Sequence, residues 1–260
     1  MSTEVSTRYK RHLEKCFQKI ATDPYVQANL PDVYSSAQSI FSKLKTSRDP
    51  LNWALEIDPP WEFAYAAPKG PPNRPVSVLL DGRIIVRDGR FSLYSFVLSV
   101  VIRSLYGNRL PPSNSCCERL KGRPFDARIV RRIHLDMHTG EECVEDEVQP
   151  AAGEKRPICH IQYGGKASEL SDYHYCQDSW LEKPRLPSPP IDVLLLLYLI
   201  IRQFLPQTSE QFEDSEWVAL IRKSEKLVWG AYYDRIARQL NRNSNALLYD
   251  ELCDPTLVWV

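Results

Sequence analysis

The spacing of apolar positions predicts two amphipathic helices near the start of the chain. Apolar side chains recur every three or four positions over Thr7 to Ile20 and again over Val33 to Leu44, which is the period of a helix with one buried face. The residues Asn-Leu-Pro-Asp at 29–32 separate the two runs. Asp32 is the predicted N-cap of the second helix, because its carboxylate can accept a hydrogen bond from a backbone N–H of the first turn.

The middle of the chain carries turn and strand signals. Residues 51–75 combine aromatic side chains with prolines, and predict an extended segment with at most one short strand. Val76 to Leu80 and Arg83 to Val86 are mainly apolar runs on either side of Asp81-Gly82, a dipeptide that favours the type I′ turn of a β-hairpin. The apolar run Phe91 to Tyr106 then predicts a buried helix.

Two later segments alternate between apolar and polar residues with the period of a strand. Ile129 to His138 is the first, and its polar face is predicted to carry Val130, Arg132, His134, Asp136 and His138. Ile158 to Tyr163 is the second, with His160 and Gln162 on one face. An acidic connection over residues 140–155 joins them. The pattern predicts two strands that form a long antiparallel hairpin.

The last third of the chain has the longer period of helices. Ile191 to Leu205 is apolar on nearly every face, which predicts a helix buried in the centre of the protein. Glu216 to Leu240 predicts one long helix or two consecutive helices around Gly230.

These elements together predict an α+β protein. Its sheet is small and mainly antiparallel, contains Val76 to Val86, Ile129 to His138 and Ile158 to Tyr163, and is flanked by N- and C-terminal helices. We expect residues 1–260 to form one compact domain, with a helical part at 1–50, a sheet-containing part at 51–190 and a helical part at 191–250.

Composition narrows the class of protein. The chain has 260 residues, and its 33 Lys and Arg balance its 33 Asp and Glu, which excludes the strong positive charge of an obligate nucleic-acid binder. The longest apolar stretch, Val193 to Ile201, is too short to span a membrane, and Met1 to Lys10 is too polar for a signal peptide. The seven Cys show no repeated spacing. We expect a soluble, cytoplasmic protein with reduced thiols and no membrane partner.

Imidazole and carboxylate side chains gather on the polar strand face. If the two strands pair, His160 lies beside His134 or Asp136. Imidazole nitrogens and carboxylate oxygens are ligands of divalent metal ions, and the predicted metal ligands are His134, Asp136, His138 and His160. The sequence therefore suggests a metal-dependent hydrolase or nuclease in which His134, Asp136 and His160 are the catalytic candidates.

Other interpretations of this face stay open. It can be a solvent-facing surface without a function, or a polar groove that binds a partner or an anionic ligand through Arg132, His134 and His160, with Gln162 on the same face. The basic segment Arg123 to Arg132 also suggests a nucleic-acid-binding module. Because the chain has many aromatic residues and no complete catalytic set, we favour an interaction protein that binds a protein partner. Its oligomeric state is not predicted.

Three motifs resemble a group of bacterial domains. They are Arg132-Ile-His-Leu-Asp-Met-His138, Pro157-Ile-Cys-His-Ile-Gln-Tyr-Gly-Gly165 and Pro184-Arg-Leu-Pro-Ser-Pro-Pro190, followed by a Leu-rich helix. In this order, over Ile129 to Phe204, they resemble uncharacterised bacterial domains of unknown function. Such domains are often encoded near defence or toxin–antitoxin genes. The resemblance implies an accessory role in such a system and singles out Asp136, His160 and Arg185.

Overall fold

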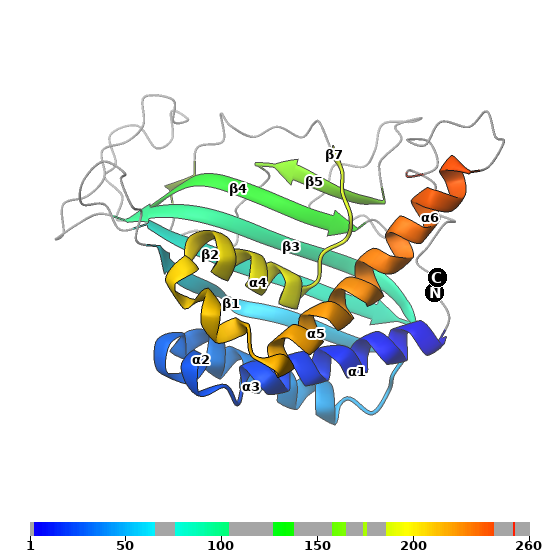
Figure 1. Ribbon diagram of the computed structural model, residues 1–260, viewed down its shortest axis with the longest axis horizontal. Coiled ribbons are helices and arrows are strands. Elements are labelled where there is room, and N and C mark those ends of the chain that lie inside the picture. The colour runs from blue at the N-terminus through cyan, green and yellow to red at the C-terminus, as the bar shows by residue number, and fades with distance from the viewer. Residues whose placement is uncertain are drawn as a thin grey trace.

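The protein is an α+β protein, as the sequence predicts. We use a computed structural model, which describes residues 3–65, 76–103, 127–137, 158–164, 174–175, 186–241 and 252. Helices from both ends of the chain pack on a mainly antiparallel sheet (Figure 1). Among these residues, no helix combines the length and the apolar character that crossing a membrane requires.

The described strands form one seven-stranded sheet in the order β1-β2-β3-β4-β5-β7, with β6 paired to β4. They are β1 (Trp53–Tyr65), β2 (Val76–Arg87), β3 (Arg90–Arg103), β4 (Ala127–Met137), β5 (Cys159–Tyr163), β6 (His174–Tyr175) and β7 (Leu186–Pro187). Every pair is antiparallel except β4 with β6. Neighbouring long strands are close in the sequence, so the centre of the sheet is a meander.

The helices cover one face of this sheet (Figure 1). They are α1 (Thr3–Ile20), α2 (Pro24–Asn29), α3 (Pro31–Thr46), α4 (Val193–Phe204), the 3₁₀ helix η3 (Pro206–Phe212), α5 (Ser215–Glu225), the π-helical turn η4 (Lys226–Gly230) and α6 (Ala231–Leu240). The buried helix predicted at Ile191 to Leu205 is confirmed as α4, in which seven residues are buried. For Glu216 to Leu240, predicted as one long helix or two consecutive helices, α5 continues through the π-helical turn η4 into α6 at Gly230.

The start of α3 differs from the prediction. Asp32 lies inside the first turn, and the N-cap position is Leu30, which makes no side-chain capping bond. Pro31 takes the first helical position, where its fixed φ and missing N–H cost nothing. The capping carboxylate belongs instead to Asp23, which begins the unpredicted short helix α2.

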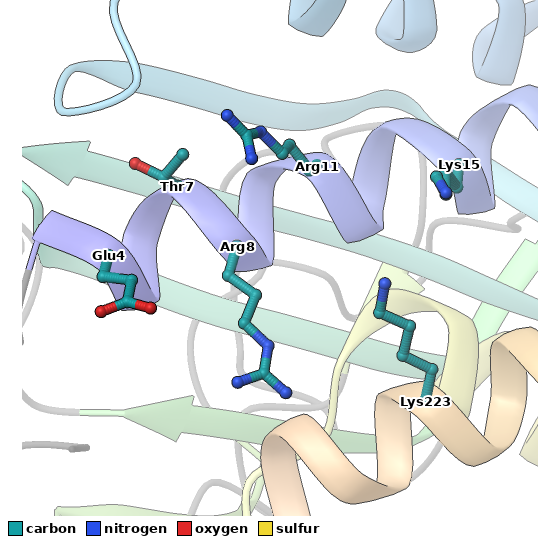
Figure 2. A pocket seen from close by; sticks show the side chains of 6 residues that line it. All are labelled: Glu4, Thr7, Arg8, Arg11, Lys15 and Lys223. Carbon is teal, nitrogen blue, oxygen red and sulfur yellow. The ribbon is translucent and has the colours of Figure 1, made fainter.

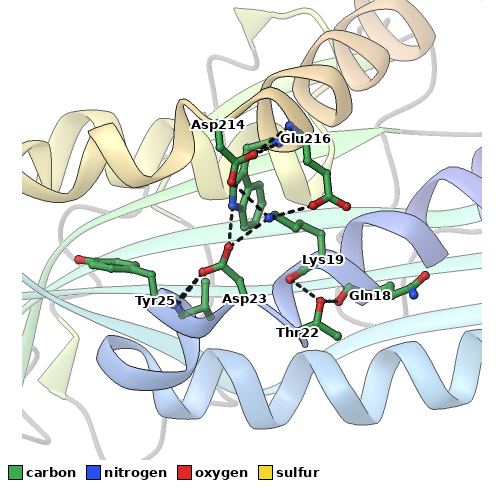
Figure 3. A network of polar contacts seen from close by, with 9 residues as sticks. Gln18, Lys19, Thr22, Asp23, Tyr25, Asp214 and Glu216 are labelled. Carbon is green, nitrogen blue, oxygen red and sulfur yellow. Dashed lines mark hydrogen bonds and ion pairs between the residues drawn. The ribbon is translucent and has the colours of Figure 1, made fainter.

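Three polar side chains join the N-terminal helices to α5 (Figure 3). The Asp23 carboxylate accepts hydrogen bonds from the backbone N–H of Tyr25 at 2.9 Å and from the indole N–H of Trp217 at 2.9 Å. Lys19 forms ion pairs with Asp23 at 3.4 Å and with Asp214 at 3.3 Å. Because Asp214 caps α5 as Asp23 caps α2, the same contacts that begin two helices also dock them together.

The hairpin turn lies at a different Asp-Gly pair from the predicted one. Asp81-Gly82 is inside β2, where Gly82 pairs with Ile57 of β1 and with Phe96 of β3. The turn between β2 and β3 is formed by Asp88 and Gly89, whose φ angles of 48° and 75° are the positive values that a type I′ turn requires.

The segment Phe91 to Tyr106 was also predicted as a buried helix, but its described part belongs to the central strand β3. Both of its faces are largely buried, so its apolar residues are nearly continuous and do not show the alternation of a half-exposed strand. The prediction for residues 51–65 was also wrong, because β1 is a strand of thirteen residues. Pro59 and Pro60 fit this edge strand at a register irregularity between Ile57 and Trp61, where the ladder does not need their N–H groups.

A β-bulge changes the faces of β4. Val100 of β3 pairs with Arg131 and the next residue, Val101, pairs with Ile129. Consecutive β3 residues point to opposite faces, so Ile129 and Arg131 do as well. The predicted alternation of faces along Ile129 to His138 is therefore wrong at Ile129 and Arg131, which it would place on the same face. From Arg132 to Met137 the predicted alternation holds.

Candidate functional site

The polar residues predicted from β4 and β5 meet on the sheet face opposite the helices. Arg132, His134 and Asp136 alternate along β4, and register pairs His134 with Gln162 and Asp136 with His160. Their neighbours along the strands, Leu135, Met137 and Cys159, pack in the apolar cluster between sheet and helices, so the polar residues face the other way. The prediction that His160 lies beside Asp136 is therefore confirmed by the strand register.

Asp136 is the centre of this polar cluster. One carboxylate oxygen, Oδ1, accepts a 2.5 Å hydrogen bond from the Ser95 hydroxyl of β3. The other, Oδ2, lies 3.9 Å from His134 Nδ1 and 3.9 Å from His160 Nε2. Arg132 Nε donates a 3.0 Å hydrogen bond to His134 Nε2. The carboxylate thus faces two imidazoles and a hydroxyl at once.

These contacts determine which ring nitrogen of His134 carries a proton. A nitrogen that accepts from an arginine carries a lone pair, so His134 is neutral and holds its proton on Nδ1. That N–H faces Asp136. A histidine oriented by an aspartate in this way can hold or move a proton at a ring nitrogen, but here the second nitrogen is occupied by Arg132.

The side chains of this cluster are too buried to form a solvent-facing strand surface. His160 is completely buried, Arg132 is 3% exposed, and the side chains of His134 and Asp136 are only 17% and 11% exposed. Charged groups are buried in proteins when other groups pair with them. The contacts to Asp136 and His134 therefore fit a network that fixes the packing of three strands.

Two predicted site residues and part of the basic segment lie outside the described residues. They are His138, Arg185 and residues 123–126 of the basic segment. At the end of that segment, Arg131 is exposed and Arg132 is buried. In the described part of the chain, no group of three or more His, Cys, Asp or Glu is arranged to hold a metal ion. The metal site and the nucleic-acid module stay predictions.

Sequence reasoning missed Ser95 as a member of the polar cluster. The serine lies in β3 opposite Asp136, in the segment that was predicted as a helix. A signal for it was present, because Ser95 and Ser99 recur at an even spacing among apolar residues. Such a spacing places both serines on one face of a strand.

A second polar cluster is buried between α1, α4 and α5. His12 Nε2 lies 2.7 Å from the Ser224 hydroxyl and 3.4 Å from the Cys16 sulfur. Burial lowers the pKa of His12 to about 4, with Lys223 and Lys15 adding to the effect. Burial also raises the pKa of the Cys16 thiol well above its usual value. A thiol that stays protonated next to a neutral imidazole is not an activated nucleophile.

Asp192, the N-cap of α4, titrates in this buried region. Burial raises its pKa to about 6, against the opposing hydrogen bond from the Leu195 backbone N–H. The folded protein thus holds a proton that the unfolded chain releases between about pH 4 and 6. This stabilising contribution is complete below that window and is lost as the pH rises through it.

Asp192→Asn is therefore expected to stabilise the protein at pH 8 and to have little effect at pH 4. Asparagine is an equally good N-cap and carries no buried charge, so we expect a gain of about 1–2 kcal/mol at pH 8, part of the about 3 kcal/mol that such a pKa shift represents. Urea unfolding of both proteins at the two pH values measures it. Comparing the variant with the wild type at each pH cancels the opposite effect of His12. An equal difference at both pH values would contradict the role of Asp192.

Comparison of the chain with models of protein families, with curated proteins and with solved structures gives no match. The function is therefore argued from the geometry of this chain.

Proposed function

We propose that the protein is an accessory protein that acts by binding a protein partner, in a bacterial defence or toxin–antitoxin-like system. The bacterial setting is supported by the motif resemblance over Ile129 to Phe204. Partner binding is supported by one observation, the exposed apolar stripe on α6 formed by Tyr233, Ala237 and Leu240.

The α6 stripe follows from helix geometry. Its three residues are separated by four and three positions, so they lie on the same side of the helix. Tyr233 is 53% exposed and Leu240 is 67% exposed, and Ala237 is exposed as well. Exposed apolar residues that are contiguous on one face are typical of an interaction surface.

The position of α6 suits this role. Figure 1 shows α6 continuing from α5 and leading away from α1, α2 and α3. The adjacent side of the helix, with Tyr232, Ile236 and Gln239, is partly buried, so α6 is anchored along that side while the stripe stays exposed. An amphipathic helix of this kind binds by placing its apolar residues in a groove of the partner. We therefore expect a partner with an apolar groove.

Buried polar networks support the same proposal. His160 is completely buried, and the Cys16–His12 pair is buried and neutral. Neither is placed like a group that meets a substrate.

The test changes two residues of the α6 stripe and leaves the other residues of the helix unchanged. A photo-crosslinking amino acid at position 233, introduced in a bacterium that carries the gene, identifies the protein that contacts α6. That partner is then purified, and its affinity is measured for the wild type and for the double variant Tyr233→Asp, Leu240→Asp. We expect the affinity to fall by about tenfold or more, because apolar anchors dominate binding energy.

The matched control is the double variant Asp234→Ala, Arg238→Ala on the same helix, where both residues are exposed. We expect its affinity to stay within about twofold of the wild type. Circular dichroism checks that both variants remain folded. If the stripe variant binds as tightly as the control, α6 is not the binding element. Loss of resistance to phage or toxin with the stripe variant alone connects the contact to the proposed system.

A further inference from the structure

A pocket lined with cations lies between α1 and α5, far from the polar cluster on the sheet. Its volume is about 620 Å³, and its lining residues are Glu4, Thr7, Arg8, Arg11, Lys15 and Lys223. Figure 2 shows Arg8 reaching from α1 toward α5, and Lys223 reaching from α5 toward α1. Pockets of this volume are typical of small-molecule sites.

Helix geometry explains why the cations share one place. Arg8, Arg11 and Lys15 are separated by three and four positions, so they lie on one side of α1. Their seven-residue span covers about 10 Å along the helix axis. Lys223 completes the group from α5, which packs beside α1 through the contact between His12 and Ser224. The lining of the pocket therefore has four positive charges and one negative charge, that of Glu4.

These cations differ from the basic side chains that form ion pairs with carboxylates. Lys10, Lys19, Arg83 and Arg202 each lie within 4.0 Å of a carboxylate. Within the described ranges, no such ion pair joins Arg8, Arg11, Lys15 or Lys223 to an acidic residue. Like charges three and four positions apart destabilise a helix unless an anion compensates them.

The positive charges of the pocket also act on a buried neighbour, His12. His12 follows Arg11 on α1 and is buried, and Lys223 and Lys15 both add to the lowering of its pKa. The two lysines belong to different helices and act on the same imidazole. Both lysines therefore lie near the same buried imidazole, one from each helix.

We propose that this pocket binds a small molecule that carries several phosphate groups. Arg8 and Lys223 contact the phosphates from opposite sides. Arginine and lysine both bind phosphate oxygens through charge-assisted hydrogen bonds. The volume of about 620 Å³ and the short basic span suit a compact polyphosphate. A nucleic acid would need a longer basic surface than the about 10 Å that Arg8, Arg11 and Lys15 cover along α1.

The experiment measures the binding of inorganic tripolyphosphate by calorimetry at low salt. Inorganic phosphate is the comparison ligand, and a single-stranded oligonucleotide of about 20 nucleotides tests for an extended surface. We expect tripolyphosphate to bind about tenfold or more tightly than phosphate, because it contacts several cations at once. We also expect it to bind more tightly than the oligonucleotide.

Two pairs of variants make the test specific. Lys223→Gln and Arg8→Gln are each expected to weaken tripolyphosphate binding by about tenfold or more, the loss expected for a charged hydrogen bond. Arg222→Gln is the matched control, because Arg222 is exposed on α5 beside Lys223 and is not part of the pocket lining. Lys45→Gln on α3 is a second control with the same loss of charge.

Each contrary result overturns the proposal. If tripolyphosphate does not bind at millimolar concentration, the pocket is not a polyphosphate site. Equal weakening by Arg222→Gln and Lys223→Gln means that binding follows net charge and not the pocket. Tighter binding of the oligonucleotide, weakened by the same two substitutions, means that the cations belong to a nucleic-acid surface. Because the stripe of α6 shares no residue with this pocket, the partner-binding proposal is tested separately.

Discussion

Replacing Asp23 by alanine is expected to lower the free energy of unfolding by about 2–4 kcal/mol. Two losses add up. The N-cap of α2 is removed, which costs about 1 kcal/mol. The indole N–H of the buried Trp217 also loses its acceptor at 2.9 Å, and an unsatisfied buried donor costs about 1–3 kcal/mol. Urea unfolding followed by circular dichroism measures the change.

Asp214→Ala is the matched control for Asp23→Ala. Asp214 caps α5 and pairs with Lys19, so it resembles Asp23 in both respects, but it is exposed and does not accept from the Trp217 indole. We expect a loss of about 1 kcal/mol from this variant. Equal losses from both variants would show that the indole contact contributes nothing. A double-mutant cycle of Asp23→Ala with Trp217→Phe isolates that contact.

The helices could be predicted because their signals are local. The period of apolar residues identified α1, α3 and α4, and Gly230 marked the change from α5 to α6. The short α2 was missed because six residues contain too few turns for a periodic pattern. Its signals are the pair Asp23-Pro24, an N-cap followed by proline at the first helical position.

The strands were harder to predict because burial on both faces removes the alternation. β3 is central in the sheet, and apolar side chains occupy both of its faces, so its composition resembles that of a buried helix. The turn was ambiguous for another reason. Asp81-Gly82 and Asp88-Gly89 have the same sequence and are both flanked by apolar runs, and only packing across the sheet distinguishes them.

The candidate site could be predicted in part. Alternation along β4 and β5 was enough to bring His134, Asp136 and His160 together. The burial of His160 could not be predicted, because it depends on tertiary packing and not on the strand itself. The pocket of cations was also missed, since it needs Lys223 to pack beside Arg8 from a helix more than two hundred residues away.

Gly82 packs against Phe96 of β3, so Asp81-Gly82 lies inside β2 and does not form the turn between β2 and β3. Gly82 and Phe96 are paired across β2 and β3, and the completely buried Phe96 ring lies directly over the glycine. A Cβ atom on Gly82 would come within 2.1 Å of Phe96 Cδ1 and 2.6 Å of Cε1. No side chain fits there unless the ring moves.

Gly82→Ala is therefore expected to destabilise the protein by about 3 kcal/mol, the upper part of the range for overpacked cores. Gly230→Ala is the control, because a Cβ there meets no atom within 4 Å and alanine in a helical conformation is neutral or stabilising by about 0.5–1 kcal/mol. Thermal and urea unfolding measure both. Phe96→Leu frees space over Gly82, so the double variant with Gly82→Ala is expected to lose less than the sum of the single losses. Simple additivity would mean that the Phe96 ring is not what requires a glycine at this position.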